Sequence, residues 1–216
     1  MAGTRVFGIP SRLGILLMLA CQRQPEARPD AGSPPSPTRH IPTDASRADS
    51  SLEPGDSSMP TWTLHSTAFD AGRAIPKRHT GDGQDLSPPL GWSDPPSATR
   101  ALALVVDDPD APTPEPWVHW LLYNVPPSVK SLPEGVPTTR TLTQPPGAAQ
   151  GLNSWQKPGY RGPAPPPGHG THHYHFKLYA LDTALGLNAG LDKRALLDAM
   201  QGHILVETEL IGTYER

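Results

Sequence analysis

The sequence contains one cysteine, Cys21, among its 216 residues. A single cysteine cannot form a disulfide within the chain, so the fold has no disulfide framework. The chain also lacks a surplus of basic residues, because 18 Lys and Arg stand against 21 Asp and Glu, which gives a formal net charge of −3. The sequence has no basic stripe and no basic helix, so we expect no nucleic-acid partner.

Aromatic residues are missing from one long stretch. Residues 22–58 contain seven prolines and no Phe, Tyr or Trp, and all five tryptophans come later in the chain. Such a stretch cannot bury enough apolar surface to offset the entropy lost on ordering its backbone. We therefore expect residues 21–58 to be a disordered tether and residues 59–216 to form one domain, which is long enough for a core of ordinary size.

The hydrophobic run at the start of the chain is too short for a permanent membrane helix. This run, Leu13–Ala20, follows Arg5 and Arg12 without any acidic residue, which predicts a signal peptide at residues 1–20. The run ends directly before Cys21, as in a bacterial lipoprotein signal whose cysteine is acylated after cleavage. We expect lipidation at Cys21 and a membrane-anchored protein of the bacterial cell envelope, outside the cytoplasm. Ordinary secretion with an incidental cysteine is the alternative.

Helical periodicity is scarce beyond residue 58. Instead, short runs rich in Val, Leu, Tyr and Trp alternate with clusters of Pro and Gly, which is typical of strands in a mainly antiparallel β protein. The runs that predict strands are 101–106, 117–125, 171–182 and 203–212. One helix is expected over 191–202, where apolar residues fall on one side and Gly202 stands at a C-terminal stop position.

Three carboxylates follow the first of these runs. Asp107, Asp108 and Asp110 come directly after a hydrophobic strand end, and two prolines stiffen the turn that carries them. Carboxylates at such a position either form a binding site or cap the loop by accepting hydrogen bonds from backbone N–H groups. The spacing Asp-x-Asp after an apolar strand also occurs as the nucleophile of phosphotransferases. That class requires alternating strands and helices, which this chain does not have.

The next run, WVHWLLYNV, contains a histidine between two tryptophans. Strict strand alternation places His119 on the same face as Leu121 and Tyr123. Trp120 then lies on the opposite face. A single histidine in such a strand is commonly a hydrogen-bonded core residue, and His119 becomes a candidate for a site only together with the other motifs.

Four of the nine histidines fall within the stretch HGTHHYHF. His169 belongs to a loop, and alternation in the following strand places His172 on one side with Tyr174. The same alternation places His173 and His175 on the other side, so the four rings do not converge. A specific zinc site requires three or four ligands. We therefore expect no metal site, and we expect the face with His173 to be mostly solvated.

Five blocks, in this order, resemble the phosphatidylethanolamine-binding protein family, in particular its bacterial branch of YbhB/YbcL or Raf kinase inhibitor-like proteins. The matching blocks are DLSPPLGW (85–92), DDPDAP (107–112), WVHWLLYNVPP (117–127), GLNSWQKPGYRGPAPPPG (151–168) and GTHHYHFKLYALD (170–182). The resemblance implies a mainly β fold, a sandwich of antiparallel sheets with one or two short helices near the C-terminus. It also implies a small anion-accepting pocket at one end, and the bacterial members suggest a homodimer.

Carried over residue by residue, the resemblance implies a set of ligand-binding residues. They are Asp108, Asp110, Trp117, His119, Pro166, Gly168, His172 and Tyr174. The sequence departs from the family at one position, since the family usually has Arg after the site histidine and this chain has His173. The exchange removes a permanent positive charge, which would weaken anion binding at neutral pH and make it pH-dependent.

A carboxylate in an anion pocket needs a physical explanation. A hydrogen bond from Asp108 to His119 or His172 would raise the pKa of that histidine and fix its ring, so that the other nitrogen can donate N–H to an anion. Tyr174 would add a hydroxyl donor. We therefore expect a small pocket for one anionic head group, such as phosphate or phosphoethanolamine, and no cofactor.

Three classes of function are consistent with these residues. The leading hypothesis is a non-enzymatic binding protein for a phosphate or phospholipid-type head group or a phosphorylated partner. The first alternative is a hydrolase that uses Asp108, His119 and His172 in acid–base catalysis, although no Ser or Cys lies in a nucleophile-elbow pattern. The second alternative is a protein-inhibitor module, which occurs in the wider family.

Overall fold

The computed structural model describes residues 61–216. The predicted signal peptide at residues 1–20, the lipidation site Cys21 and the tether 21–58 lie outside the described residues and stay predictions. The elements in chain order are β1 Leu64–Ser66, the 3-10 helix η1 Lys77–His79, β2 Leu90–Trp92, β3 Ala101–Asp108, β4 Trp117–Val125, β5 Ser131–Leu132, β6 Ala149–Gln150, β7 His172–Leu181, α1 Lys193–Met200 and β8 Ile204–Tyr214.

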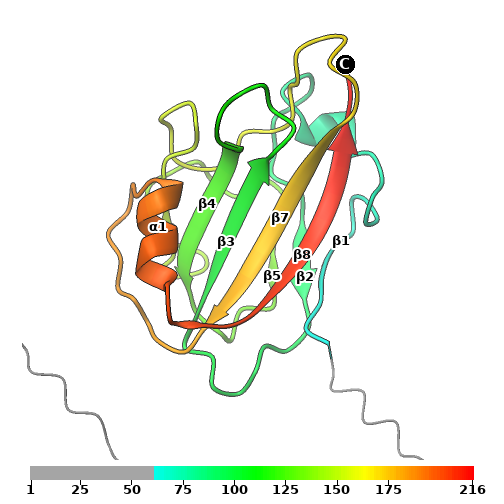
Figure 1. Cartoon of the computed structure of the whole chain (residues 1–216). Helices are drawn as coiled ribbons and strands as arrows, with labels where there is room; N and C mark the ends of the chain where they lie inside the picture. The colour runs from blue at the N-terminus through cyan, green and yellow to red at the C-terminus, as the bar shows by residue number, and fades with distance from the viewer. Residues whose placement is uncertain (1–60) are drawn as a thin grey trace, which may run out of the picture. The chain divides into compact units, whose positions relative to one another are not determined.

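The strands form two antiparallel sheets (Figure 1). The larger sheet has five strands in the order β6-β4-β3-β7-β8, and the smaller has three in the order β1-β2-β5. Within the described residues there is one α-helix, and it comes directly before the last strand. The predicted mainly β fold with antiparallel sheets and a short helix near the C-terminus is confirmed.

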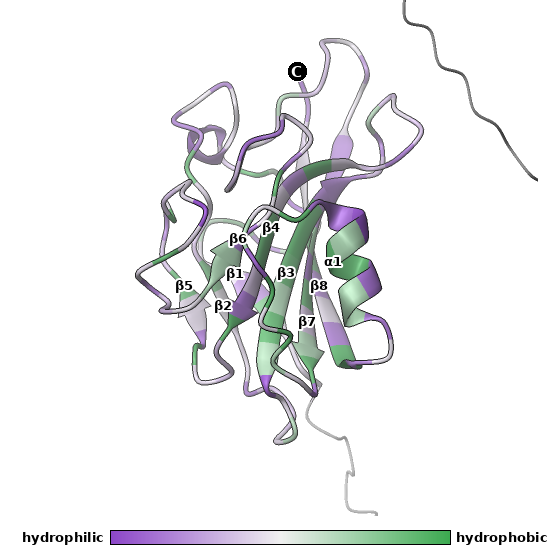
Figure 2. Cartoon of the chain, turned by 90° about the vertical axis from the view of Figure 1, so that its left-hand side faces the viewer, coloured by the Kyte–Doolittle hydropathy of each residue, from purple (hydrophilic) through white to green (hydrophobic). Residues whose placement is uncertain are grey.

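The main core lies between the two sheets. Leu104, Phe176 and Leu178 of the larger sheet pack in one cluster with Leu90 and Trp92 of the smaller sheet. Burying each of these side chains contributes about 1.5–3 kcal/mol to the hydrophobic driving force. All eight residues of β3 are buried, and Figure 2 shows most of this strand as hydrophobic. The central strand is therefore a rigid support for the residues at its end.

Helix α1 covers the outer face of the larger sheet. Leu196 and Met200 of α1 are fully buried and pack with Val105 and Leu121. The helix begins where the Asp192 side chain accepts a hydrogen bond from the Ala195 N–H at 2.8 Å, as an N-cap residue does. No helix among residues 61–216 has the length and apolar composition needed to cross a membrane.

A buried carboxylate connects α1 to the sheet. The Asp107 side chain is 1% exposed and forms ion pairs with Lys193 of α1 and, at 3.3 Å, with Lys177 of β7. Two cations compensate for the removal of this carboxylate from water. Because successive side chains of a strand point to opposite faces, Asp107 belongs to this outer face and Asp108 points to the inner one.

A β-bulge interrupts the pairing of β3 with β4. The register passes from Val106 opposite Trp120 to Asp107 opposite Val118, and His119 has no partner across the pair. The predicted strict alternation of β4 is therefore wrong at this point. Trp120 packs in the main core, whereas Val118 and Leu121 both belong to the outer cluster. The extra residue turns His119 toward the inner face, which is a common use of bulges next to binding sites.

Candidate functional site

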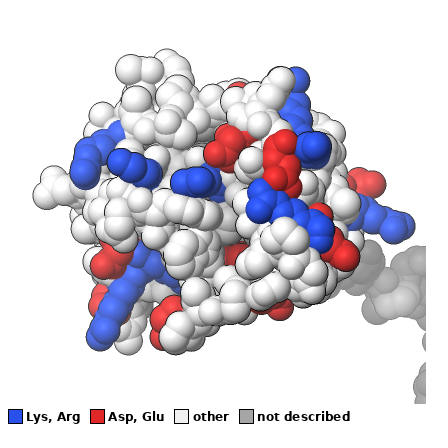
Figure 3. Space-filling model, turned by 90° about the horizontal axis from the view of Figure 1, so that it is seen from above, with Lys and Arg blue, Asp and Glu red and all other residues white. Residues whose placement is uncertain are grey.

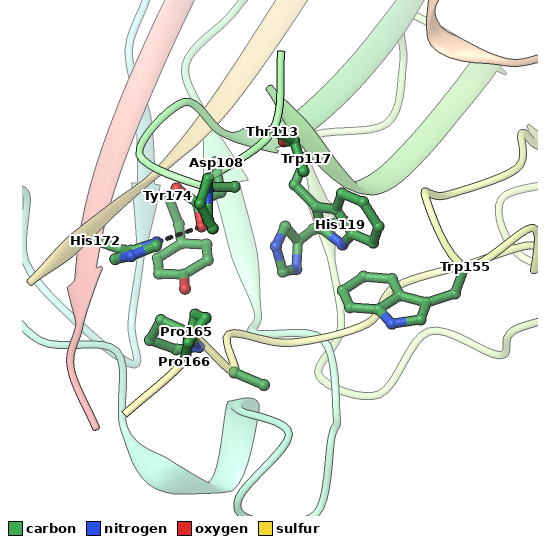
Figure 4. A pocket seen from close by; sticks show the side chains of 12 residues that line it. Asp108, Thr113, Trp117, His119, Trp155, Pro165, Pro166, His172 and Tyr174 are labelled. Atoms are coloured by element: carbon green, nitrogen blue, oxygen red, sulfur yellow. Dashed lines mark hydrogen bonds and ion pairs between the residues drawn. The ribbon is translucent and has the colours of Figure 1, made fainter. Parts of the chain in front are cut away.

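A pocket of about 220 Å³ opens at the end of the larger sheet where β3 ends and where β4 and β7 begin (Figure 4). Its lining residues are Asp108, Ala111, Pro112, Thr113, Trp117, His119, Trp155, Ala164, Pro165, Pro166, His172 and Tyr174. Pockets for drug-sized ligands have volumes of roughly 300–1,000 Å³. The smaller volume here suits a single head group.

Asp108 and His172 form a buried pair in this pocket. His172 Nδ1 lies 2.8 Å from Asp108 Oδ2, and the two side chains are only 3% and 5% exposed. The other carboxylate oxygen, Oδ1, accepts the backbone N–H of Asp110 at 2.9 Å. Since an ionised carboxylate only accepts hydrogen bonds, Nδ1 carries the hydrogen and Nε2 is the ring nitrogen left for a ligand.

His119 is held by a different group. Its Nδ1 donates to the backbone carbonyl of Arg161 at 2.5 Å, and its ring meets the Tyr174 ring edge to face at a centroid distance of 5.1 Å. Burial lowers the pKa of His119 below its ordinary value. Of the two histidines expected as partners of Asp108, the structure therefore has His172. His119 is neutral at neutral pH, so its Nε2 is a hydrogen-bond acceptor.

Tyr174 places a hydroxyl next to the pair. The residue is 1% exposed, and its hydroxyl has no hydrogen-bond partner among the described residues. Burial, together with the nearby charge of Asp108, raises the pKa of Tyr174 far above its ordinary value, so the phenol stays protonated. An unpaired buried hydroxyl costs about 1–3 kcal/mol. Figure 4 shows its ring between Asp108 on one side and Pro165 and Pro166 on the other.

Tryptophans form one wall of the pocket. Trp117 and Trp155 meet edge to face with a centroid distance of 5.3 Å, and the His119 ring meets Trp155 in the same way at 5.2 Å. The Arg161 guanidinium stacks over the Trp155 ring, with its Cζ 4.5 Å from the ring centroid. Trp155 was not among the predicted site residues. Its signal was present in the sequence, because a tryptophan in a loop rich in Gly and Pro lay inside one of the matching blocks.

The structure brings together six of the eight predicted site residues. Asp108, Trp117, His119, Pro166, His172 and Tyr174 all line the pocket. Asp110 and Gly168 lie outside the lining. Asp110 accepts hydrogen bonds from the backbone N–H and from Nδ1 of His173, both at 2.8 Å. Although partial burial acts in the opposite direction, these bonds lower the pKa of Asp110. Gly168 is an exposed loop residue with φ of 80°.

The remaining charges lie around the pocket, not inside it. The lining contains no Lys or Arg. Figure 3 looks onto this end of the molecule and shows basic and acidic side chains interspersed, without one large patch of either sign. His175 pairs with Glu209 at 2.7 Å on the opposite face of β7 from His172. Within residues 61–216, no group of three potential metal ligands occurs.

Comparison with known proteins identifies the family. The sequence model described as phosphatidylethanolamine-binding protein matches residues 65–215. A UPF0098 protein of Methanothermobacter thermautotrophicus is 48% identical over 153 residues, which cover 71% of this chain and 98% of the relative. A UPF0098 protein of Pyrococcus horikoshii is 44% identical over 151 residues, or 70% of this chain and 75% of the relative.

Solved structures give the same result. A phosphatidylethanolamine-binding protein homologue from Chlamydia trachomatis has a TM-score of 0.65 and 43% identity, and the match covers 72% of this chain and 97% of the other. YbcL of Escherichia coli, described as a member of the mammalian family, has a TM-score of 0.67 and 32% identity over 72% of this chain and 98% of its own. This chain therefore belongs to the phosphatidylethanolamine-binding protein family, on the branch that includes YbcL.

Proposed function

We propose that the pocket binds one small anionic head group, a phosphate or a phosphoethanolamine-like group, without chemical conversion. The observation that carries this proposal is the buried Asp108–His172 pair. Both oxygens of Asp108 are already engaged, one by His172 and one by the Asp110 backbone. The carboxylate thus acts as an internal acceptor, and His172 Nε2 is left to meet the ligand.

Binding of an anion at His172 is coupled to uptake of a proton. With Nδ1–H directed to Asp108, Nε2 becomes a donor only when the imidazole is protonated. The affinity for an anion therefore falls as pH rises, because at higher pH the free protein must first gain this proton.

His119 and Tyr174 add one hydrogen-bond acceptor and one hydrogen-bond donor to the site. The neutral His119 ring offers Nε2 as an acceptor, and the Tyr174 hydroxyl offers a donor that has no other partner among residues 61–216. A ligand with both an anionic oxygen and an O–H or N–H donor satisfies all three groups. A singly protonated phosphate or a phosphoethanolamine head group has this chemistry, and the name of the family supports the second.

The enzyme alternative finds less support. No Ser or Cys occurs among the lining residues of the described chain, and the hydroxyl of the lining residue Thr113 donates to the Glu115 carbonyl at 2.7 Å. The Asp108–His172 pair therefore has no serine or cysteine nucleophile to activate. No feature of residues 61–216 favours the protein-inhibitor alternative. We propose that binding takes place outside the cytoplasm, because the sequence of residues 1–21 predicts export.

Calorimetric titration with inorganic phosphate and with phosphoethanolamine tests the proposal. We expect binding at about pH 5.5 and a clearly lower affinity at about pH 8. His172→Ala should abolish binding. His175→Ala is the matched control, because it removes an imidazole from the opposite face of the same strand. Equal affinity at both pH values would contradict the proposal, and turnover of a phosphomonoester that disappears in His172→Ala would favour the hydrolase.

A further inference from the structure

Arg216 and Asp82 form a forked ion pair near the pocket rim. Arg216 Nε lies 2.8 Å from Asp82 Oδ2 and 3.0 Å from Oδ1, and Nη2 also donates to Oδ1. The Tyr214 hydroxyl donates to the same carboxylate at 2.9 Å. The hydrogen bonds from Arg216, followed by that from Tyr214, lower the pKa of Asp82 to about 2. This cluster joins the end of β8 to the loop that follows η1.

Both partners of this pair lie beside the segment that forms the rim. Arg216 Nη1 donates to the Pro165 carbonyl at 3.5 Å, and the Gly168 N–H donates to the backbone oxygen of Arg216 at 3.4 Å. One residue before Asp82, the Gly81 N–H donates to the Pro163 carbonyl at 2.8 Å. These contacts connect three segments that are far apart in the sequence.

The rim segment is also packed tightly against the η1 loop. The Gly162 N–H donates to Asp85 Oδ1 at 2.6 Å, and the Tyr160 hydroxyl donates to the His79 carbonyl at 2.7 Å. A Cβ atom added at Gly162 would lie 2.2 Å from the His79 oxygen, so only glycine permits this approach. The position of the rim prolines therefore depends on the η1 loop.

We propose that Arg216 and Asp82 are positioning residues, a clamp that holds the rim prolines 165 and 166 in place over Tyr174 and thereby sets the affinity of the pocket for its anion. The proposal rests on the proposed function. Neither residue lines the pocket. The two side chains are 31% and 25% exposed, and the pair is strengthened by its forked geometry and by Tyr214.

A positioning role and simple electrostatics predict opposite changes in anion affinity for one substitution, Asp82→Asn. Asp82→Asn removes a negative charge near an anion site, which by electrostatics alone strengthens binding of an anion. The same substitution loosens the clamp, which weakens binding. A second variant, Arg216→Lys, keeps the positive charge and loses the fork, so electrostatics predicts no change and positioning predicts weaker binding.

The experiment measures phosphate affinity by calorimetry at about pH 5.5. We expect Asp82→Asn and Arg216→Lys each to bind about three- to tenfold more weakly than the wild type. The matched control is Asp94→Asn, the same exchange at the ion pair of Asp94 with Lys130, which involves neither η1 nor the pocket lining, and it should leave the affinity unchanged. Tighter binding by Asp82→Asn, or wild-type affinity in both clamp variants, would overturn the proposal.

Hydrogen exchange separates this proposal from the proposed function. The amides of Gly81 and Gly168, which donate across the clamp, should exchange faster in both clamp variants and at the wild-type rate in the Asp94→Asn control. If the wild type binds no phosphate, the proposed function fails. Hydrogen exchange alone then tests whether the clamp holds the rim in place. Unchanged exchange at both amides would then reject the clamp.

Discussion

Replacement of Asp108 by asparagine should remove the pH dependence of anion binding without removing the binding itself. The Asp110 backbone N–H can only donate, so the oxygen of the new amide has to face it, as Asp108 Oδ1 does now. The NH2 group of the new amide then faces His172 Nδ1. This nitrogen must accept a hydrogen bond, which places the hydrogen of the neutral ring on Nε2.

The consequence for binding can be calculated from this change of tautomer. In the wild type, His172 has to gain a proton before Nε2 can donate, so the affinity falls as pH rises, by at most about tenfold, or about 1.4 kcal/mol, per pH unit. In Asp108→Asn, the neutral ring already donates from Nε2. The affinity should then change by less than about threefold between about pH 5.5 and about pH 8.

Calorimetry in two buffers of different ionisation enthalpy measures the protons taken up on binding. The wild type should take up about one proton per phosphate at about pH 7.5, and Asp108→Asn should take up about none. Exchange of the charge-assisted hydrogen bond for a neutral one lowers the free energy of unfolding by less than the about 1.5–3 kcal/mol that complete loss of such a bond costs, which a domain of ordinary stability tolerates. A variant that binds phosphate with the same pH slope and proton uptake as the wild type would refute the reasoning.

Two further substitutions separate stability from binding. Asp107→Ala leaves two partly exposed lysines without their carboxylate and should lower the free energy of unfolding by about 2–3 kcal/mol, as measured by urea denaturation. Its phosphate affinity should be unchanged. A loss of affinity without a loss of stability would contradict the structural role of Asp107. Trp155→Ala removes the edge contacts to Trp117 and His119 and should weaken phosphate binding about three- to tenfold, and wild-type affinity would show that the tryptophan wall does not position His119.

The strands and the helix could be predicted because their signals are local. The run WVHWLLYNV coincides with β4, and the residue predicted to stop the last helix, Gly202, has φ of 80° and lies two residues after α1 ends. Hydrophobic runs, turn residues and caps depend on neighbours in the sequence. For this reason they are readable without any knowledge of the packing.

The orientation of the site residues depends on pairing between strands and was only partly predictable. Alternation correctly separates His172 from His173, because β7 pairs with β8 without a shift over this part. Alternation fails for His119, because the bulge arises from the register between β3 and β4. The sequence narrowed the partner of Asp108 to two histidines. His172 could be identified as that partner only from the structure, in which β3 and β7 lie side by side.

The proposed function depends on His172 Nε2, the nitrogen that we expect to bind the anion. A crystal structure of the protein soaked with phosphate at about pH 5.5 tests it most directly. We expect a phosphate oxygen within about 3 Å of His172 Nε2, with the Asp108–His172 hydrogen bond intact. A phosphate bound elsewhere, or a pocket that holds only water at saturating phosphate, would contradict the account.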